Sequence, residues 1–177
     1  RFRVDMRVHH EVTAIHPEKK TVSVKNLKTG EEFEESYDKL ILSPGAKPTQ
    51  PRFSGTELDK VFTLRTVEDT LRIKKYINQN HPKSVVLAGG GFIGLELAEN
   101  LRELGMDVTV VEYAKQLMSP FDSDMAAFIH NEMRKHGVKL VLGRAVEGFE
   151  EKDGGVKVLL KDEAPLHADM VVLAIGV

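Results

Sequence analysis

The order of hydrophobic and polar positions divides the chain into two different patterns. Along residues 1–42, short runs with alternating or charged positions predict strands at 7–15, 21–25 and 31–36. Lys39-Leu40-Ile41-Leu42 is a short apolar run typical of a buried strand. No helical pattern accompanies these runs. We therefore predict a β-meander followed by one further strand.

From residue 66 onward, helical and strand patterns alternate. Thr66-Val67-Glu68-Asp69 is typical of a capping box, which begins a helix that extends to about residue 79. Strands alternating with helices predict the α/β class: a Rossmann-like parallel sheet with helices on both faces and an added β-meander. The predicted strands are residues 84–88, 108–112, 138–142, 147–152, 156–161 and 169–175.

A third helix is predicted over about residues 124–136, where apolar side chains repeat at helical spacing. Met125, Phe128, Ile129 and Met133 share one face of this helix. We interpret this stripe as core packing. Farther along, Asp153-Gly154-Gly155 lies between two strand patterns and predicts a hairpin turn.

The stretch Ser43-Pro44-Gly45-Ala46-Lys47-Pro48 interrupts both patterns. Prolines and a glycine at this density favour irregular chain. We therefore place a domain boundary here, with residues 1–48 in one unit and 49–177 in the other.

A glycine motif follows the strand predicted at residues 84–88. Gly89, Gly91 and Gly94 have the spacing G-x-G-x-x-G, between a strand and a helix. Gly89 allows a tight turn, Gly91 lets a pyrophosphate approach the backbone, and Gly94 allows the helix to pack close to the strand. The amide groups at the helix N-terminus then face the phosphates. The pattern predicts a dinucleotide site.

An acid ends the next predicted strand. Glu112 lies roughly 20 residues after the glycines, where a carboxylate accepts hydrogen bonds from the two hydroxyls of an adenosine ribose. The same carboxylate would repel a 2′-phosphate, so the sequence predicts NAD(H) as the preferred nucleotide. Lys115 could reduce this preference by forming an ion pair with such a phosphate, or it could be a solvated loop residue.

Composition narrows the function classes. The chain has 177 residues with 25 basic and 27 acidic side chains, and no basic block indicates nucleic acid. No apolar stretch is long enough to span a membrane. The chain has no cysteine, so it contains no thiolate nucleophile, disulfide or thiolate metal ligand. No histidine pair has metal-ligand spacing, and we expect no metal site. A lack of cysteine is compatible with the cytoplasm.

The two ends of the sequence suggest a piece of a longer polypeptide. Residue 1 is arginine, and the chain stops at Gly176-Val177, directly after an apolar strand pattern. A natural chain rarely stops just beyond a buried strand. We therefore expect further chain on both sides of these 177 residues.

Four stretches identify a resemblance that covers nearly the whole chain. The sequence resembles the flavin-dependent pyridine nucleotide–disulfide oxidoreductases, and within them the coenzyme A disulfide reductases, NADH oxidases and NADH-dependent persulfide reductases. The glycine motif is shared across the superfamily, whereas the other matching stretches are narrower. The four stretches are residues 37–46, 64–70, 89–99, and 110–112 with 118–125.

The resemblance implies an architecture and an activity. It makes residues 1–48 the middle segment of a split FAD-binding domain and residues 49–177 an NAD(H)-binding Rossmann domain. The parent would move hydride from NADH to FAD and then electrons to a coenzyme A disulfide, a persulfide or oxygen, as a cytoplasmic homodimer. The redox cysteine of the family lies outside this chain, so we expect the isolated chain to be inactive.

The resemblance also implies roles for individual residues. Phe92 matches a ring that covers the flavin until nicotinamide arrives, and Glu96 matches an acid near the nicotinamide amide. Each could instead be an ordinary packing or solvated residue. The predicted NAD contacts are Gly89, Gly91, Phe92, Ile93, Gly94, Glu96, Glu112, Tyr113 and Gly176, and the predicted FAD contacts are Val12, Ser43, Pro44, Gly45 and Ala46.

Two other functions stay open at the level of the sequence. One is a non-enzymatic dinucleotide-binding or redox-sensing module. The other is a flavoprotein of the rubredoxin- or ferredoxin-reductase type, which uses the same two domains without the cysteine. An upstream FAD fingerprint and cysteine in the parent gene would separate these alternatives from a disulfide reductase.

Overall fold

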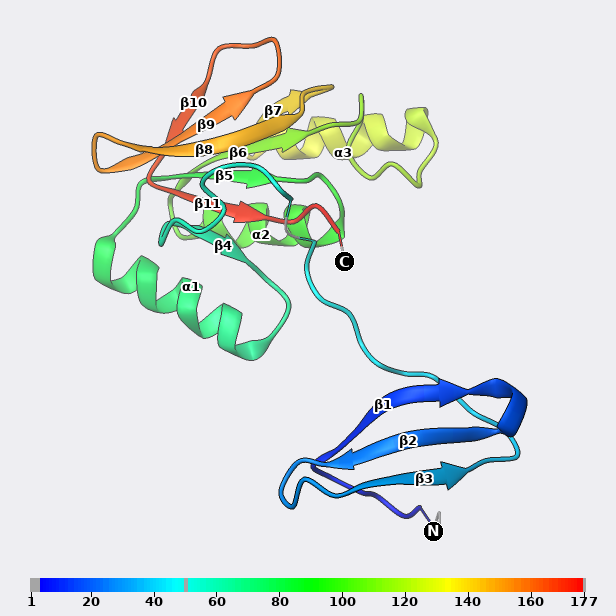
Figure 1. Ribbon diagram of the computed structural model, residues 1–177. Coiled ribbons are helices and arrows are strands. Elements are labelled where there is room, and N and C mark those ends of the chain that lie inside the picture. The colour runs from blue at the N-terminus through cyan, green and yellow to red at the C-terminus, as the bar shows by residue number, and fades with distance from the viewer. Residues whose placement is uncertain (1–3, 50, 177) are drawn as a thin grey trace. The chain divides into compact units, whose positions relative to one another are not determined.

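The structure is a computed structural model that describes residues 4–49 and 51–176. The chain divides into two compact units, Arg1–Gly45 and Ala46–Val177. The division falls inside the proline- and glycine-rich stretch at residues 43–48 (Figure 1).

The first unit is a three-stranded antiparallel sheet. Its strands are β1 (His10–His16), β2 (Thr21–Asn26) and β3 (Glu32–Ser36), in the order β1-β2-β3 (Figure 1). A short 3-10 turn, η1 (Pro17–Lys19), joins the first two. The predicted meander is confirmed, and Val22 and Val24 of β2 are its buried side chains.

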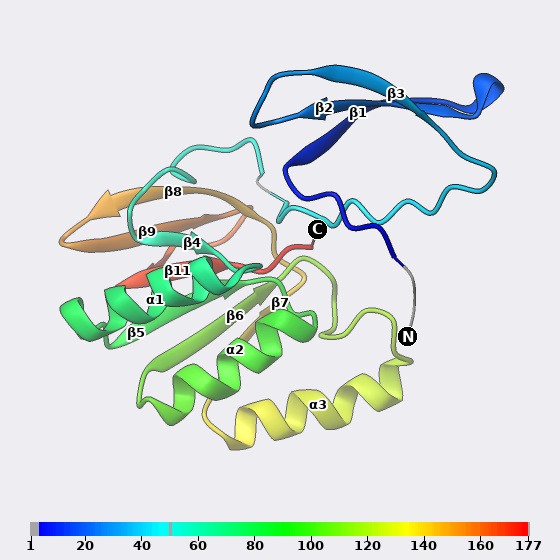
Figure 2. The ribbon, with the colours of Figure 1, turned by 90° about the horizontal axis from the view of Figure 1, so that it is seen from below.

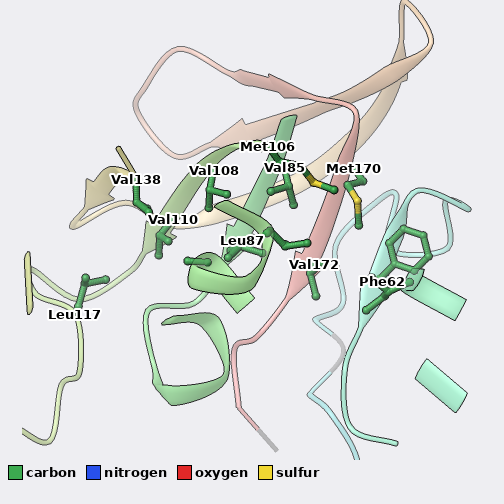
Figure 3. Packing of buried hydrophobic residues seen from close by; sticks show 13 residues of the cluster. Phe62, Val85, Leu87, Met106, Val108, Val110, Leu117, Val138, Met170 and Val172 are labelled. Atoms are coloured by element: carbon green, nitrogen blue, oxygen red, sulfur yellow. The ribbon is translucent and has the colours of Figure 1, made fainter. Parts of the chain in front are cut away.

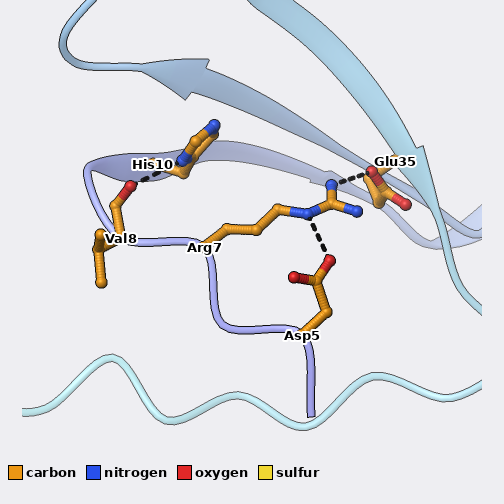
Figure 4. A network of polar contacts seen from close by, with 5 residues as sticks. All are labelled: Asp5, Arg7, Val8, His10 and Glu35. Carbon is orange, nitrogen blue, oxygen red and sulfur yellow. Dashed lines mark hydrogen bonds and ion pairs between the residues drawn. The ribbon is translucent and has the colours of Figure 1, made fainter. Parts of the chain in front are cut away.

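A polar network connects the chain before β1 to the edge strand β3. Arg7 donates to Glu35 at 2.7 Å and to Asp5 at 3.0 Å, and His10 Nδ1 lies 2.9 Å from the Val8 carbonyl oxygen (Figure 4). The hydrogen bond to Glu35, and then the one to Asp5, raise the pKa of Arg7. The groups are exposed, so the network contributes little to stability.

The predicted strand at residues 39–42 is wrong. This segment forms neither strand nor helix, and Ile41 is 88% exposed. An apolar run becomes a buried strand only where a neighbouring strand pairs with it and side chains cover it. Among the described residues, no strand pairs with residues 39–42.

The second unit is built on a five-stranded parallel sheet. Its strands are β4 (Val61–Thr63), β5 (Ser84–Ala88), β6 (Asp107–Glu112), β7 (Lys139–Leu142) and β11 (Met170–Leu173). Their order is β4-β11-β5-β6-β7, and every neighbouring pair is parallel. The α/β class and the parallel sheet are confirmed. The sequence did not predict β4, which has only three residues.

The prediction of helices on both faces of the sheet is wrong. The helices α1 (Val67–Asn80), α2 (Phe92–Glu103) and α3 (Ser123–Lys135) lie on one face (Figure 2). The path β4, β5, β6, β7 runs in one direction across the sheet, so right-handed crossovers place all three helices on the same side.

The β-meander covers the opposite face of the sheet. It consists of β8 (Val146–Lys152), β9 (Gly155–Leu160) and β10 (Leu166–Ala168), in the order β10-β9-β8. The chain crosses back from β7 to β11 through this meander, so the right-handed rule puts it on the face without helices. Asp153 and Gly154 both have positive φ, which confirms a tight hairpin turn between β8 and β9.

The alternating side chains of the central strands fill two separate cores. In β5, Val85 and Leu87 point toward the helices (Figure 3), whereas Val86 and Ala88 point toward the meander. Phe149 of β8 is 2% exposed and belongs to the meander core. Because both faces are covered, these strands are apolar at nearly every position.

Only part of the predicted apolar stripe of α3 belongs to the core. Ile129 and Met133 pack against the helix-side core, as expected. Met125 and Phe128 are 53% and 71% exposed, so the interpretation is wrong for these two residues. They lie in the N-terminal half of the helix.

Candidate functional site

Two of the three glycines of the G-x-G-x-x-G motif, Gly89 and Gly94, are required for packing between β5 and α2. Gly89 has φ of +114°, and a Cβ there would lie 2.2 Å from the Ala174 carbonyl oxygen. A Cβ on Gly94 would lie 2.1 Å from the carbonyl oxygen of Gly89. Both obstacles are backbone atoms. The roles predicted for Gly89 and Gly94, a tight turn and close helix–strand packing, match this geometry.

Gly91 has the opposite environment. It is the N-cap of α2, and no heavy atom lies within 4 Å of an ideal Cβ at this position. No side chain caps the helix N-terminus. The turn therefore leaves open space in front of the amide groups of the first helical turn, the environment that favours a phosphate.

Glu112 lies at the carboxyl end of β6, and each of its carboxylate oxygens accepts a hydrogen bond from a backbone amide. Its Oε2 accepts a hydrogen bond from the Gly90 amide at 2.6 Å, and its Oε1 accepts one from the Ala114 amide at 2.7 Å. Each oxygen of a carboxylate has two acceptor positions. One position on each oxygen is thus still available for two further donors, such as a pair of ribose hydroxyls.

The segment after β6 folds back onto the glycine turn. The Met118 amide donates to the Gly90 carbonyl oxygen at 2.9 Å. Leu117 is fully buried, and its Cδ2 would lie 2.4 Å from a Cβ on Gly90. Gly90 is therefore confined by a close side chain and by hydrogen bonds at both its amide and its carbonyl.

The glycine turn, Glu112 and this segment border one cavity of about 670 Å³. The cavity lies at the carboxyl ends of β5, β6 and β11, the edge where open α/β sheets bind ligands. Of the residues predicted from the sequence, those lining it are Gly89, Gly91, Phe92, Ile93, Glu112, Tyr113 and Gly176. Gly94 is buried beneath the turn.

The cavity also contains two cations that sequence reasoning missed. Arg65 and Arg144 line it, and Arg144 Nε donates to Glu163 at 2.9 Å. Arg144 comes shortly after the strand predicted at residues 138–142. The sequence signal for Arg144 is its position just after a predicted parallel strand, because the carboxyl ends of parallel strands meet at one edge of the sheet.

A smaller hollow lies elsewhere on this unit. It has a volume of about 400 Å³ and borders α1 and the edge strand β4, with Arg72, Lys75 and Tyr76 among its lining. It contains none of the predicted site residues and lacks the glycine turn. The larger cavity is therefore the candidate site.

Two aromatic side chains form an exposed pair beside the cavity. Phe92 is 66% exposed, and its ring meets Phe121 edge to face with 6.4 Å between centroids. Tyr113, which follows Glu112 in the chain and also lines the cavity, is 79% exposed. At this exposure Phe92 is not a buried packing residue. Its role as a ring that covers the flavin until nicotinamide arrives stays a prediction.

The structure does not bring Glu96 into the cavity. Glu96 is exposed and lines a groove between α2 and α3 together with Glu99 and Glu132. In an α-helix, a residue four positions after Phe92 points along the same side but one turn away from the N-terminus. Its contact with nicotinamide stays a prediction.

The predicted FAD residues do not belong to this cavity. Val12 lies on β1 and is 55% exposed. Ser43, Pro44, Gly45 and Ala46 lie in exposed chain outside the helices and strands. They build no enclosed site by themselves, and their contacts with FAD stay a prediction.

Other kinds of site were sought in the part of the chain that the structure describes. Within residues 4–49 and 51–176, no three histidine, aspartate or glutamate side chains are grouped so that they could hold a metal ion. None of the helices over the same residues has the length and apolar character needed to cross a bilayer.

Comparisons with known proteins agree with this geometry. A family model described as pyridine nucleotide-disulphide oxidoreductase matches residues 1–177. The coenzyme A disulfide reductase of Staphylococcus aureus strain NCTC 8325 is 38% identical over 176 residues, covering 99% of this chain.

Two solved structures are similar to the chain. One is the reduced CoADR-RHD protein of Bacillus anthracis, with a TM-score of 0.82 and 48% identity, covering 98% of this chain and 31% of that protein. The other is the water-forming NADH oxidase of Lactobacillus brevis bound to NADH, with a TM-score of 0.80 and 34% identity, covering 94% and 37%. The chain spans only 39% of the length of the Staphylococcus aureus relative.

Proposed function

The chain belongs to the pyridine nucleotide-disulphide oxidoreductase family, and on that premise we propose that residues 49–177 are its NAD(H)-binding domain. The observation that carries the proposal is the Glu112 carboxylate. It is fixed by two backbone amides, and it lines a cavity that also borders the open helix N-terminus at Gly91.

Different residues of this chain contact different parts of the nucleotide. The pyrophosphate lies at the N-terminus of α2, where Gly91 has no side chain to obstruct it. The adenosine ribose donates to the free acceptor positions of Glu112. Tyr113 borders the adenosine end, and Phe92 borders the nicotinamide end near Gly176. The predicted residues Gly89 and Ile93 also line the cavity, whereas Glu96 and Gly94 stand outside its lining.

We propose that residues 1–48 form the middle segment of the FAD-binding domain, with Val12 and Ser43–Ala46 against the flavin nucleotide. Bound FAD would accept the hydride from NADH and would pass its electrons on to the final acceptor. The names of the similar proteins support a coenzyme A disulfide or oxygen as the final acceptor, with a persulfide as a further possibility. The whole protein would be a cytoplasmic homodimer. Any redox cysteine would come from outside this cysteine-free chain.

The test is titration of the purified chain with NADH. The chain has no tryptophan, so the fluorescence of bound NADH can be read without interference from indole. Wild type is expected to bind NADH with saturation. Gly91→Asp is expected to abolish binding, because its carboxylate would occupy the open space and repel the pyrophosphate.

A matched control adds the same charge at a distant glycine. Gly30 lies in a turn of the first unit with open space around it; its φ of +77° strains any side chain, but aspartate is among the residues that adopt a positive φ most often. Gly30→Asp should bind NADH as wild type does. Absence of saturable NADH binding by a folded wild-type chain would contradict the proposed function, and so would equal binding by both variants.

A further inference from the structure

A histidine outside the cavity holds the segment that confines the glycine turn. The Leu117 amide donates a hydrogen bond to His130 Nε2 at 3.0 Å. A backbone amide is always a donor, so Nε2 must be unprotonated and the ring must be neutral, with its proton on Nδ1. His130 lies on α3, is half-buried, and is not among the cavity-lining residues.

The contact continues from His130 to the nucleotide site through three short steps. His130 fixes the amide of Leu117, whose side chain is fully buried beside Gly90. The next residue, Met118, donates its amide to the Gly90 carbonyl oxygen at 2.9 Å. The Gly90 amide in turn donates to Glu112 at 2.6 Å. Each step is a hydrogen bond or a tight contact.

We propose that neutral His130 is a positioning residue for NAD(H): it holds Leu117 and Met118 against Gly90, and through Gly90 it sets the orientation of the Glu112 carboxylate. The inference rests on the proposed function, because it assigns Glu112 to the ribose. His130 itself touches no part of the nucleotide. Its effect reaches the ribose through Leu117, Met118, Gly90 and the Glu112 carboxylate.

The same geometry makes the contact sensitive to acid. Protonation would place a hydrogen on Nε2, and the Leu117 amide would lose its acceptor. Burial, and then the charge of Arg134, lower the pKa of His130 below 6.5. The elements near His130 also carry other charged groups: Glu112 at the end of β6, Lys115 and Asp122 in the segment before α3, Asp124, Glu132 and Lys135 on α3, and Lys139 on β7.

The direction of the pH effect follows from this lowered pKa. A histidine whose pKa is lower in the folded state stabilises that state fully above pH 6.5. This contribution is lost as the pH falls through the folded-state pKa. Affinity for NADH should therefore decrease in the same range, while affinity at pH 7 to 8 stays constant.

The experiment measures the dissociation constant of NADH across this pH range in the full chain. His130→Leu removes the acceptor and is expected to weaken NADH about three- to tenfold at pH 7.5, the scale of the net contribution of one hydrogen bond. His130→Gln supplies a carbonyl oxygen that does not titrate. It should bind within about twofold of wild type and lose the decrease at low pH. His136→Gln, at the exposed C-terminal end of the same helix, should keep the wild-type pH profile.

The possible outcomes separate this inference from the proposed function. If wild type fails to bind NADH, the proposed function is contradicted. If wild type binds and His130→Leu binds equally well, the positioning role is wrong, even where urea unfolding shows a loss of stability. If His130→Leu does not fold, wild type and His130→Gln still decide the question, because superimposable pH profiles for these two would overturn it.

Discussion

Gly94 packs directly on the carbonyl oxygen of Gly89, with only 2.1 Å between that oxygen and the position of a Cβ on Gly94. Gly94 lies in the first turn of α2, and Gly89 directly follows the last residue of β5. Their contact is where the helix meets the strand. A flexible side chain could move away from an added methyl group, but a backbone carbonyl in a tight turn cannot. Close approach of helix and strand at this point therefore depends on glycine.

We expect Gly94→Ala to lower the free energy of unfolding by about 1–3 kcal/mol, the usual cost of overpacking. Urea denaturation measures this directly. Gly91→Ala is the matched control, because the added methyl group meets no atom within 4 Å. It should leave stability nearly unchanged while weakening NADH. Equal destabilisation by the two variants would contradict the separate roles of these glycines.

The position of Glu112 predicts discrimination between nucleotides. In NADPH, a phosphate with a charge of about −1.5 to −2 replaces one ribose hydroxyl and would face the carboxylate. We expect NADH to bind more tightly than NADPH by on the order of 1–3 kcal/mol, the penalty for a badly paired polar group. Titration of both nucleotides at fixed ionic strength measures the difference.

Glu112→Ala should remove most of this discrimination by weakening NADH more than NADPH. The alanine also releases the amides of Gly90 and Ala114, so some loss of affinity for both nucleotides is expected. Glu112→Gln keeps an acceptor oxygen without the charge and separates the two effects. Equal wild-type affinities for NADH and NADPH would contradict the assignment and direct attention to Lys115.

Phe92 should affect the nicotinamide half of the nucleotide alone. We expect Phe92→Ala to change NADH affinity but to leave the affinity for ADP-ribose, which lacks nicotinamide, within about twofold. Because the ring is 66% exposed, the stability should change by less than about 1 kcal/mol. Phe128→Ala, an exposed phenylalanine away from the cavity lining, is the control. Parallel changes for both ligands would argue for a general packing role.

The capping box of α1 provides a prediction about stability and pH. Asp69 accepts hydrogen bonds from the amides of Thr66 and Arg65 at 3.0 and 2.9 Å, and its own amide donates to Thr66. We expect Asp69→Ala to cost about 1 kcal/mol. Glu68→Ala, in the same helical turn, should cost less, because each of these three hydrogen bonds involves Asp69. Urea denaturation of both variants gives the comparison.

Acid should remove the same contribution in the wild type. The hydrogen bonds, that from Thr66 first, lower the pKa of Asp69 below 3.8 in the folded state. Such a group stabilises the fold above pH 3.8 and loses its effect as the pH falls through the folded-state pKa. The difference between wild type and Asp69→Ala should therefore shrink below pH 3.8. A constant difference down to pH 2 would be inconsistent with an ionised cap.

Most of the second unit could be predicted because its signals are local. The capping box at Thr66, the glycine turn and the Asp153-Gly154 hairpin each specify a backbone conformation within a few residues. Which face of the sheet the helices cover depends on the strand order instead. That order requires the knowledge that β11 lies between β4 and β5, a contact between distant parts of the chain.

The candidate site shows the same division between local and distant information. Gly91 and Glu112 were predicted because a motif and an offset identify them. His130 and Arg144 were not, since their roles depend on contacts across the unit. The exposed segment at residues 39–42 failed for a related reason: its apolar side chains indicate burial, but they do not say which surface covers them.

The position of β11 between β4 and β5 also determines when the second unit can finish folding. β11 pairs on one side with β4 at residues 61–63 and on the other with β5 at residues 85–88. During synthesis, both of these strands leave the ribosome long before their shared neighbour exists. The helix side can form early from nearby segments, but the sheet stays divided until residues 170–173 arrive. Pairings this distant in sequence slow the search for the native state, and the waiting strand edges are exposed to other chains meanwhile.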